Sequence, residues 1–290
     1  MAGILDLLDD GSSLSCGGWW DAYDATFISG SGTVTIRSGT TDRVDAITDK
    51  SGDGWTLSNG ESSDADHPQL IDGALRFDEN GDHHLKNASF SQDWDSVTMF
   101  ASFTFNDDPH HTVLVGQGAS GTAADFMIML RQDTDPATTM DWQYKVGNGS
   151  AITTNSNIVG AFTAGIKRVV TFIVHPTATD TVRLRISSHT SADDVAVTNL
   201  YDATIADTSS SGGMLGSATV GNGLWVNAHS SSSATHAYTA GIDLHELALF
   251  DGACSATEIS RIENYMLSHG PPQSPTQTQP GIGLSIISRR

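Results

Sequence analysis

The chain has 290 residues, of which 34 are acidic and 14 are lysine or arginine, so its formal net charge is -20. A surface this acidic repels phosphate backbones, and we therefore expect no nucleic-acid partner. No apolar run approaches the roughly 20 residues that span a bilayer, so we expect no membrane insertion.

The first element along the chain is a short apolar segment. Ile4, Leu5, Leu7 and Leu8 lie close together and are followed by two aspartates and a glycine. The segment is too short to form a stable helix alone. We define residues 1–18 as an N-terminal docking segment, which either packs back on the rest of the chain or docks on a neighbouring subunit. Its start lacks the basic region of a signal peptide, so we expect synthesis in a cytoplasm without export.

The middle of the chain is rich in glycine, serine and threonine and contains many short apolar segments that alternate with polar residues. Such alternation predicts half-buried strands. In residues 181–187, for example, Leu184 and Ile186 would face inward while Arg183 and Arg185 face water. The expected strands are 33–37, 74–77, 97–105, 112–116, 125–131, 140–146, 167–175, 181–187, 218–221, 223–228 and 240–250. This number of short strands predicts an all-β fold of two antiparallel sheets packed as a sandwich.

One helix is specified by local signals near the end of the chain. Ser255 and Glu258 form the S-x-x-E pattern of a capping box, and Ile259, Ile262 and Met266 then recur on one face. Glycine and two prolines at 270–272 end the helix. The expected core consists of large apolar residues on the predicted strands: Phe77, Phe100, Phe103, Phe172, Leu184, Ile186, Leu247 and Leu249.

The last residues, 270–290, are expected to form an extended C-terminal arm. Residues 271–281 are rich in proline and glutamine, a composition typical of an extended spacer. Beyond this spacer Ile282, Leu284 and Ile286 alternate, and Ile287 follows. An apolar strand-like peptide on a spacer cannot bury itself well. We therefore interpret these four residues as a docking peptide that adds a strand to a partner.

Several motifs at the two ends of the chain resemble one known family. They are W-W-D-A-Y-D at 19–24, D-K-S-G-D-G at 49–54, G-A-L-R-F-D at 73–78 and H-E-L-A-L-F-D at 245–251. Together they resemble the concanavalin A-like, laminin G-like jelly-roll domains found in many bacteriophage virion proteins and some bacterial surface proteins. The resemblance covers roughly 19–269 and implies a jelly-roll sandwich with a short C-terminal helix and extended terminal arms.

The resemblance also implies a function. It suggests a non-enzymatic structural protein of a phage or phage-like virion, located on the head or the tail and released by lysis. Its partners would be other virion proteins and further copies of itself. Because this fold also hosts lectins and hydrolases, the resemblance alone does not fix the function.

Two other functions are open. A glycan-binding module that attaches to a host surface would use an aromatic platform with nearby polar groups, for which Trp225, Asn227 and His229 are the candidates. A glycan hydrolase needs two carboxylates that flank the sugar. The nearest run contains Asp243 and Glu246 at the wrong spacing, and Glu246 is expected on a core strand. We therefore expect no catalytic residues.

Metal binding is the remaining chemistry to consider. Asp78, Asn80 and Asp82 gather oxygen ligands around a glycine turn, which is the type of site that Ca²⁺ prefers. Asp49 and Asp53 form a second oxygen-rich turn. The alternative is that these residues only form turns. The acidity of the whole chain fits cation sites, a salt-rich habitat or simple solubility.

Two further residue types are weak signals. The pairs His83-His84 and His110-His111 occupy adjacent positions, which point to opposite faces of a strand, so we expect surface or hairpin histidines rather than metal ligands. Cys16 and Cys254 could be close enough in such a sandwich for a disulfide. Two isolated cysteines in a cytoplasm are more often reduced thiols.

Overall fold

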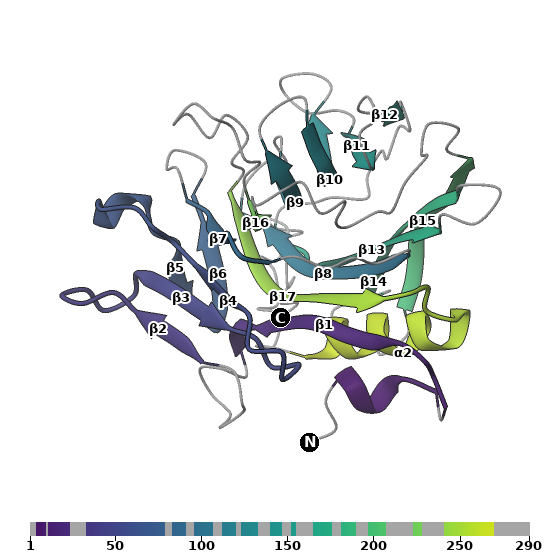
Figure 1. Cartoon of the computed structure of the whole chain (residues 1–290), viewed down its shortest axis with the longest axis horizontal. Coiled ribbons are helices and arrows are strands. Elements are labelled where there is room, and N and C mark those ends of the chain that lie inside the picture. Colours follow the sequence, from purple (N-terminus) through teal and green to yellow (C-terminus); the bar gives the residue numbers. More distant parts are fainter. Residues whose placement is uncertain are drawn as a thin grey trace, which may run out of the picture.

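Figure 1 shows the computed structural model of the chain, in which two antiparallel β-sheets pack against each other and helix α2 (Ala256–Ser268) covers one of them. The structure describes residues 4–9, 11–23, 33–78, 83–90, 96–106, 112–119, 123–132, 140–146, 152–154, 165–175, 181–189, 197–206, 223–227 and 241–269. The expected two-sheet antiparallel sandwich with a short C-terminal helix is confirmed for these residues.

Sheet A has eight strands in the described part of the chain, and each strand runs antiparallel to the strands it pairs with. Its order is β15-β14-β13-β8-β17-β6-β5, and β1 pairs with β17 beside this path. The strands are β15 (Val197–Ala206), β14 (Thr181–His189), β13 (Arg168–His175), β8 (Val97–Phe105), β17 (Ile242–Asp251), β6 (Ala74–Phe77), β5 (Gln69–Ile71) and β1 (Ser15–Asp21). The expected hairpin of residues 167–187 is the pair β13–β14.

Sheet B has nine strands in the same described part, in the order β12-β11-β10-β9-β16-β7-β4-β3-β2. An isolated bridge between Arg43 and Gln69 joins the two sheets near β3 and β5. The strands are β12 (Ile152–Thr154), β11 (Met140–Val146), β10 (Ala123–Gln132), β9 (Thr112–Ala119), β16 (Leu224–Val226), β7 (Leu85–Asn87), β4 (Thr56–Ser58), β3 (Val44–Thr48) and β2 (Val34–Ile36). Two 3-10 helices are η1 (Ile4–Leu7) and η2 (Asp64–Asp66).

The main apolar core lies between the sheets. It contains alternate residues of the facing strands, such as Trp20, Phe77 and Phe103 from sheet A and Leu57 and Val226 from sheet B. All eight residues expected in the core are fully buried. Phe100 is buried on the other side of sheet A, where it packs with Phe250.

A second apolar layer covers the outer face of sheet A. Figure 1 shows α2 on the side of sheet A away from β9 to β12, and the helix contacts β8, β13, β14 and β15. Ile259, Ile262 and Met266 of α2 pack there with Trp19 and Phe250. Because both faces of the central strands are covered, every residue of 97–105 except Thr104 is buried.

The helix also corrects one expectation about strand β14. Its outward face was expected to be in water, yet Arg185 is buried and binds Glu263 of α2, with Nε–Oε1 and Nη2–Oε2 distances of 3.0 Å each. An arginine tolerates burial when a carboxylate satisfies its fork of donors. Arg183, further from the helix, stays partly exposed and pairs with Asp202.

The start of α2 matches its sequence signals. Ser255 is the N-cap, its hydroxyl accepts from the backbone N–H of Glu258, and Glu258 accepts from the backbone N–H of Ser255. The N-terminal segment meets the helix here: Ile4 is fully buried against α2, and the backbone N–H of Asp9 donates to Glu258. Residues 4–9 therefore pack back on the sandwich, which was the first of the two alternatives. No helix among the described residues is long and apolar enough to cross a membrane.

Candidate functional site

The aromatic residue among the glycan candidates that the structure describes is Trp225, on the outer face of sheet B. Leu224 and Val226 on the same strand are buried in the inter-sheet core, so Trp225 between them points the opposite way. It is half-buried, and β16 is the middle strand of the nine described in sheet B. The alternation of β16 thus places an indole near the centre of this outer face.

The neighbours of Trp225 come from both adjacent strands. Lys86 stands opposite it on β7, with Nζ 4.9 Å from the centroid of the indole. On β9 the register partner is Gly116, which has no side chain to cover the ring. The imidazole of His84 lies 5.3 Å away, tilted by 30°. The indole therefore contacts Lys86 and His84, and its register partner on β9 is a glycine.

Polar groups surround this aromatic residue. The Oε1 atom of Glu61 lies 4.0 Å from Nε2 of His84, and the Glu61 side chain is exposed. Ser58 is the register partner of Lys86 on β4, and its hydroxyl donates to the Lys86 carbonyl. An ammonium thus lies over the indole, and a carboxylate and a hydroxyl lie beside the two residues that contact it. These are groups that can hydrogen-bond to sugar hydroxyls.

The side chain of Asn227 is not accessible to a glycan. It is fully buried, has a left-handed φ of 58°, and its Nδ2 donates to the backbone carbonyl of His83 at 3.0 Å. Asparagine tolerates this backbone conformation better than most residues. Asn227 therefore ties the end of β16 to the segment before β7. His229 lies outside the described residues.

The histidines before β7 were expected at the surface, and this expectation was wrong. His83 and His84 are both buried. Nδ1 of His83 accepts the backbone N–H of Asp78, so Nε2 carries the proton and donates to the carbonyl of Ala65 at 2.6 Å. Burial lowers the pKa of His83 and keeps the ring neutral. Two backbone partners make a buried imidazole tolerable.

The other sequence candidates are only partly covered. Asp78 is exposed, whereas Asn80 and Asp82, together with His110 and His111, lie outside the described residues. Within the described part of the chain, no group of three His, Cys, Asp or Glu side chains is placed to hold a metal ion. The docking peptide lies outside it as well: Ile282, Leu284, Ile286 and Ile287.

Both carboxylate-rich segments considered for chemistry have structural partners. Asp49 accepts the backbone N–H of Trp19 and of Ser51, each at 2.7 Å, and so shapes its own turn. On β17, Asp243 forms a two-point ion pair with Arg76, while Glu246 faces Asp21 on β1. Asp21 and Glu246 are both buried under the end of α2 and out of reach of a substrate.

Cys16 and Cys254 are free thiols, as expected, and burial raises the pKa of each to about 12. A thiol with so high a pKa is a poor nucleophile. Neither cysteine is therefore a catalytic candidate in this structure.

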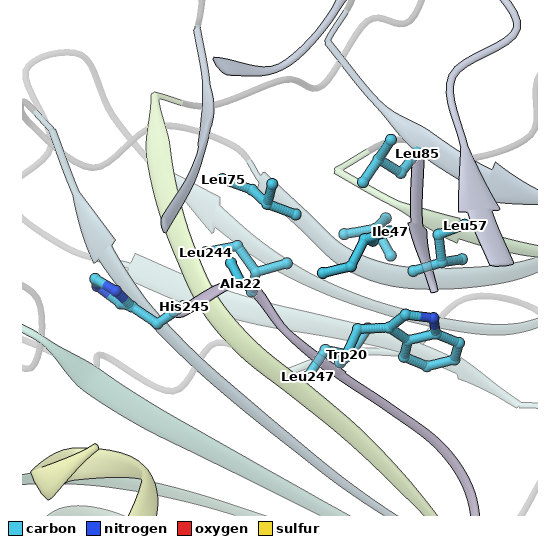
Figure 2. A pocket seen from close by; sticks show the side chains of 10 residues that line it. Trp20, Ala22, Ile47, Leu57, Leu75, Leu85, Leu244, His245 and Leu247 are labelled. Carbon is cyan, nitrogen blue, oxygen red and sulfur yellow. The ribbon is translucent and has the colours of Figure 1, made fainter. Parts of the chain in front are cut away.

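The cavity drawn in Figure 2 lies inside the sandwich and is too small for a ligand. Its volume is about 10 Å³, which is room for no more than one water molecule. The cavity is lined mostly by apolar core residues from both sheets: Trp20, Ala22, Ile47, Leu57, Leu75, Leu85, Val226, Leu244, His245 and Leu247. A small molecule is more readily held on the outer surface than here.

The chain matches no protein-family model and no curated protein, but its fold is similar to that of solved structures. An arabinofuranosidase complexed with arabinofuranosyl-alpha-1,2-xylobiose has a TM-score of 0.51 and 12% identity, over 78% of this chain and 51% of that chain. Trypanosoma rangeli sialidase in complex with sialic acid has a TM-score of 0.47 and 12% identity, over 88% of this chain and 33% of that chain. The Ruminococcus gnavus IT-sialidase CBM40 has a TM-score of 0.42 and 11% identity, over 59% of this chain and 84% of that chain.

The chain spans about half the length of the arabinofuranosidase and a third of the sialidase. At 12% identity, the likeness to the arabinofuranosidase shows the fold alone. The chain is therefore a β-sandwich protein, and the class of its ligand must be argued from its own residues.

Proposed function

We propose that this chain is a non-catalytic carbohydrate-binding domain that holds a glycan on the outer face of sheet B. The observation that carries the proposal is the half-buried indole of Trp225 on the middle strand of that sheet, with the Lys86 ammonium over it and Glu61 beside the neighbouring His84. The corresponding face of sheet A is covered by α2 and η1. The outer face of sheet B is not covered by these two helices, and Trp225 lies on it.

The physical basis is a combination of stacking and hydrogen bonding. The apolar face of a pyranose ring packs on an indole, and charged groups beside the indole bind the hydroxyls at the ring edge. In the free protein the Lys86 ammonium lies over the Trp225 ring. An incoming sugar would replace that ammonium on the indole, and the displaced ammonium could then donate to the sugar hydroxyls.

Two observations support a binding role over hydrolysis. Asp21 and Glu246 are buried beneath α2 and cannot flank a glycosidic bond. Asp243 is held by Arg76. The arabinofuranosidase of similar fold was solved with an oligosaccharide, which makes carbohydrates the ligand class to test first. A role in a bacteriophage virion, with virion proteins or further copies of the chain as partners, stays a prediction that these comparisons do not address.

A glycan array tests the proposal directly. The purified wild-type protein should bind a restricted set of oligosaccharides, and Trp225→Ala should weaken that binding at least tenfold, a loss of about 1.4 kcal/mol. Tyr265→Ala is the control, because Tyr265 is half-buried on α2, against the opposite sheet. A thermal melt of each variant verifies that it is folded. The proposal is wrong if the wild type binds no carbohydrate, or if folded Trp225→Ala binds as well as the wild type.

A further inference from the structure

Motif residues from both ends of the chain meet beneath the last turn of α2. Asp21 at the end of β1 is the register partner of Glu246 on β17, and both are buried. Lys50, from the D-K-S-G-D-G segment, reaches the same place, since its backbone N–H donates to the Trp19 carbonyl. The sequence thus brings two carboxyl groups together in a buried environment, where charge is costly.

The two carboxyl oxygens of Glu246 differ in their hydrogen bonding. Oε1 accepts a hydrogen bond of 2.6 Å from the indole Nε1 of Trp19. Oε2 is buried and has no hydrogen-bond partner among the described residues. Opposite Glu246 on β8 is Ser102, whose buried hydroxyl likewise has no partner there. One carboxylate oxygen therefore lies in a place where an ionised group would be poorly solvated.

Asp21 is well satisfied and connects to the end of the helix. Its Oδ2 accepts from Nζ of Lys50 at 3.2 Å and lies 3.0 Å from Nε2 of His269. His269 is the C-cap of α2. Its ring stacks on Tyr265 with 4.8 Å between centroids, and Tyr23 contacts it edge-on at 5.4 Å.

Lys167 is the second link to the helix end. It is buried at the start of β13, and its Nζ donates to the backbone carbonyl of His269. His269 is therefore held through its ring by Asp21 and through its carbonyl by Lys167.

Burial shifts the pKa values of Glu246 and Lys167. Burial, and then the nearby charge of Asp21, raise the pKa of Glu246 to about 8, although His269, Lys167 and the Trp19 hydrogen bond oppose the change. Burial lowers the pKa of Lys167 to about 8, against the attraction of Glu246 and Asp21. The neighbouring His245 is buried too, and burial and Lys167 lower its pKa.

We propose that these residues form a pH-responsive clamp on the end of α2: a protonated Glu246 leaves Lys167 on the carbonyl of His269, and loss of that proton loosens the helix end from β1. An ionised Oε2 is an acceptor without a partner, so it competes with the His269 carbonyl for the Lys167 ammonium. It also adds a second negative charge beside Asp21. Both effects weaken the attachment of His269 without touching the rest of the sandwich.

The direction of the pH effect follows from the raised pKa. A carboxyl group that binds its proton more tightly in the closed clamp favours closure below its closed-state pKa, and this advantage is lost as the pH rises towards about 8. Each pH unit in the window between about 4.5 and 8 can change the open-to-closed ratio by up to about tenfold. Glu246→Gln mimics the protonated acid, keeps the acceptor for Trp19, and should remove the effect.

Two measurements over pH 5 to 9 test the clamp. The Trp19 indole N–H resonance, identified by its loss in Trp19→Phe, should titrate with a midpoint near 8 in the wild type and be flat in Glu246→Gln. Amide-exchange protection factors of residues 262–269, corrected for the intrinsic effect of pH, should fall in the wild type only, by up to about tenfold per pH unit as the pH rises from 5 to about 8. Lys167→Met should show low protection at every pH.

The wild-type titration does not depend on any variant being folded. A Trp19 midpoint below pH 5 would mean that Glu246 ionises normally, and the clamp is then rejected. Equal protection of residues 262–269 in wild type and Glu246→Gln at all pH values also rejects it. Neither result bears on carbohydrate binding, which takes place on sheet B.

Discussion

Arg185 on β14 binds both carboxylate oxygens of Glu263 on α2, although the two residues are 78 positions apart. Two hydroxyls complete the arrangement, from Thr171 at 2.8 Å and from Ser187 at 2.9 Å. All four residues are buried. A buried carboxylate with four hydrogen bonds fixes the position of the helix on the sheet.

The first prediction concerns this attachment. Glu263→Ala should lower the free energy of unfolding by about 3–5 kcal/mol, because it leaves the buried Arg185 guanidinium without its main partner. Arg261→Ala is the matched control on the same helix. It removes an exposed ion pair with Asp9 and a long hydrogen bond to the Leu7 carbonyl, and should cost at most about 1 kcal/mol. Urea denaturation measures both values, and equal losses in the two variants would contradict this account of the helix.

A second prediction concerns the indole of Trp19. Trp19→Phe removes the donor to Glu246 and should cost about 1–3 kcal/mol beyond the loss of packing. Trp55→Phe is the control. It makes the same substitution at a tryptophan whose Nε1 has no hydrogen-bond partner among the described residues. The difference between the two variants in urea denaturation reports the hydrogen bond together with any weakening of the contact between the Lys50 ammonium and the ring at position 19. No difference would mean that the Trp19 bond contributes nothing net.

The third prediction concerns the acid side of the pH range. Burial, followed by the charge of Lys167, lowers the pKa of His245 well below its ordinary value. The unfolded chain therefore takes up a proton below about pH 6.5 that the folded chain does not, and stability falls as the pH drops. His245→Gln cannot titrate, so its stability should fall less than that of the wild type between pH 7 and 5 in urea denaturation. The effect of Glu246 is present in both proteins and cancels in the comparison. Parallel pH profiles would contradict the prediction.

The fourth prediction retains the calcium hypothesis for Asp78, Asn80 and Asp82. If these residues hold Ca²⁺, a chelator should lower the melting temperature, because a ligand bound only by the folded state stabilises it. Added Ca²⁺ should then restore it. Identical melts with and without chelator would leave the three residues as turn formers. We do not expect the turn at Asp49 to contribute to this effect, because the Asp49 carboxylate already accepts hydrogen bonds from two backbone N–H groups.

The sequence predicted the elements whose signals are local. The bounds of β8 and β11 agree with the expected strands, and the capping box of Ser255 and Glu258 marked the start of α2. Strand β1 was missed because Gly17 and Gly18 weaken its β-propensity, although pairing with β17 overrides that weakness. Strand β15 was also missed, because Asn199 and Asp202 are residues typical of turns.

The candidate site was predictable only in part, for a related reason. The alternation of β16 was enough to place Trp225 on an outer face. The burial of Asn227 depends on its bond to His83, which is 144 positions away. The burial of Arg185 depends on a helix that follows it by 78 positions. Contacts over such separations are tertiary and leave no periodic signal in the sequence.

The most direct test of carbohydrate binding is a titration followed through the tryptophan side chains. The chain has six tryptophans, and each indole N–H gives its own resonance in a ¹⁵N-labelled sample. The protein would be titrated with the oligosaccharide that binds most tightly on the array. We predict that the Trp225 indole shows the largest saturable shift, whereas those of Trp19 and Trp20 barely move. Saturable shifts centred on Trp19 or Trp20, with Trp225 unchanged, would contradict a glycan site on the outer face of sheet B.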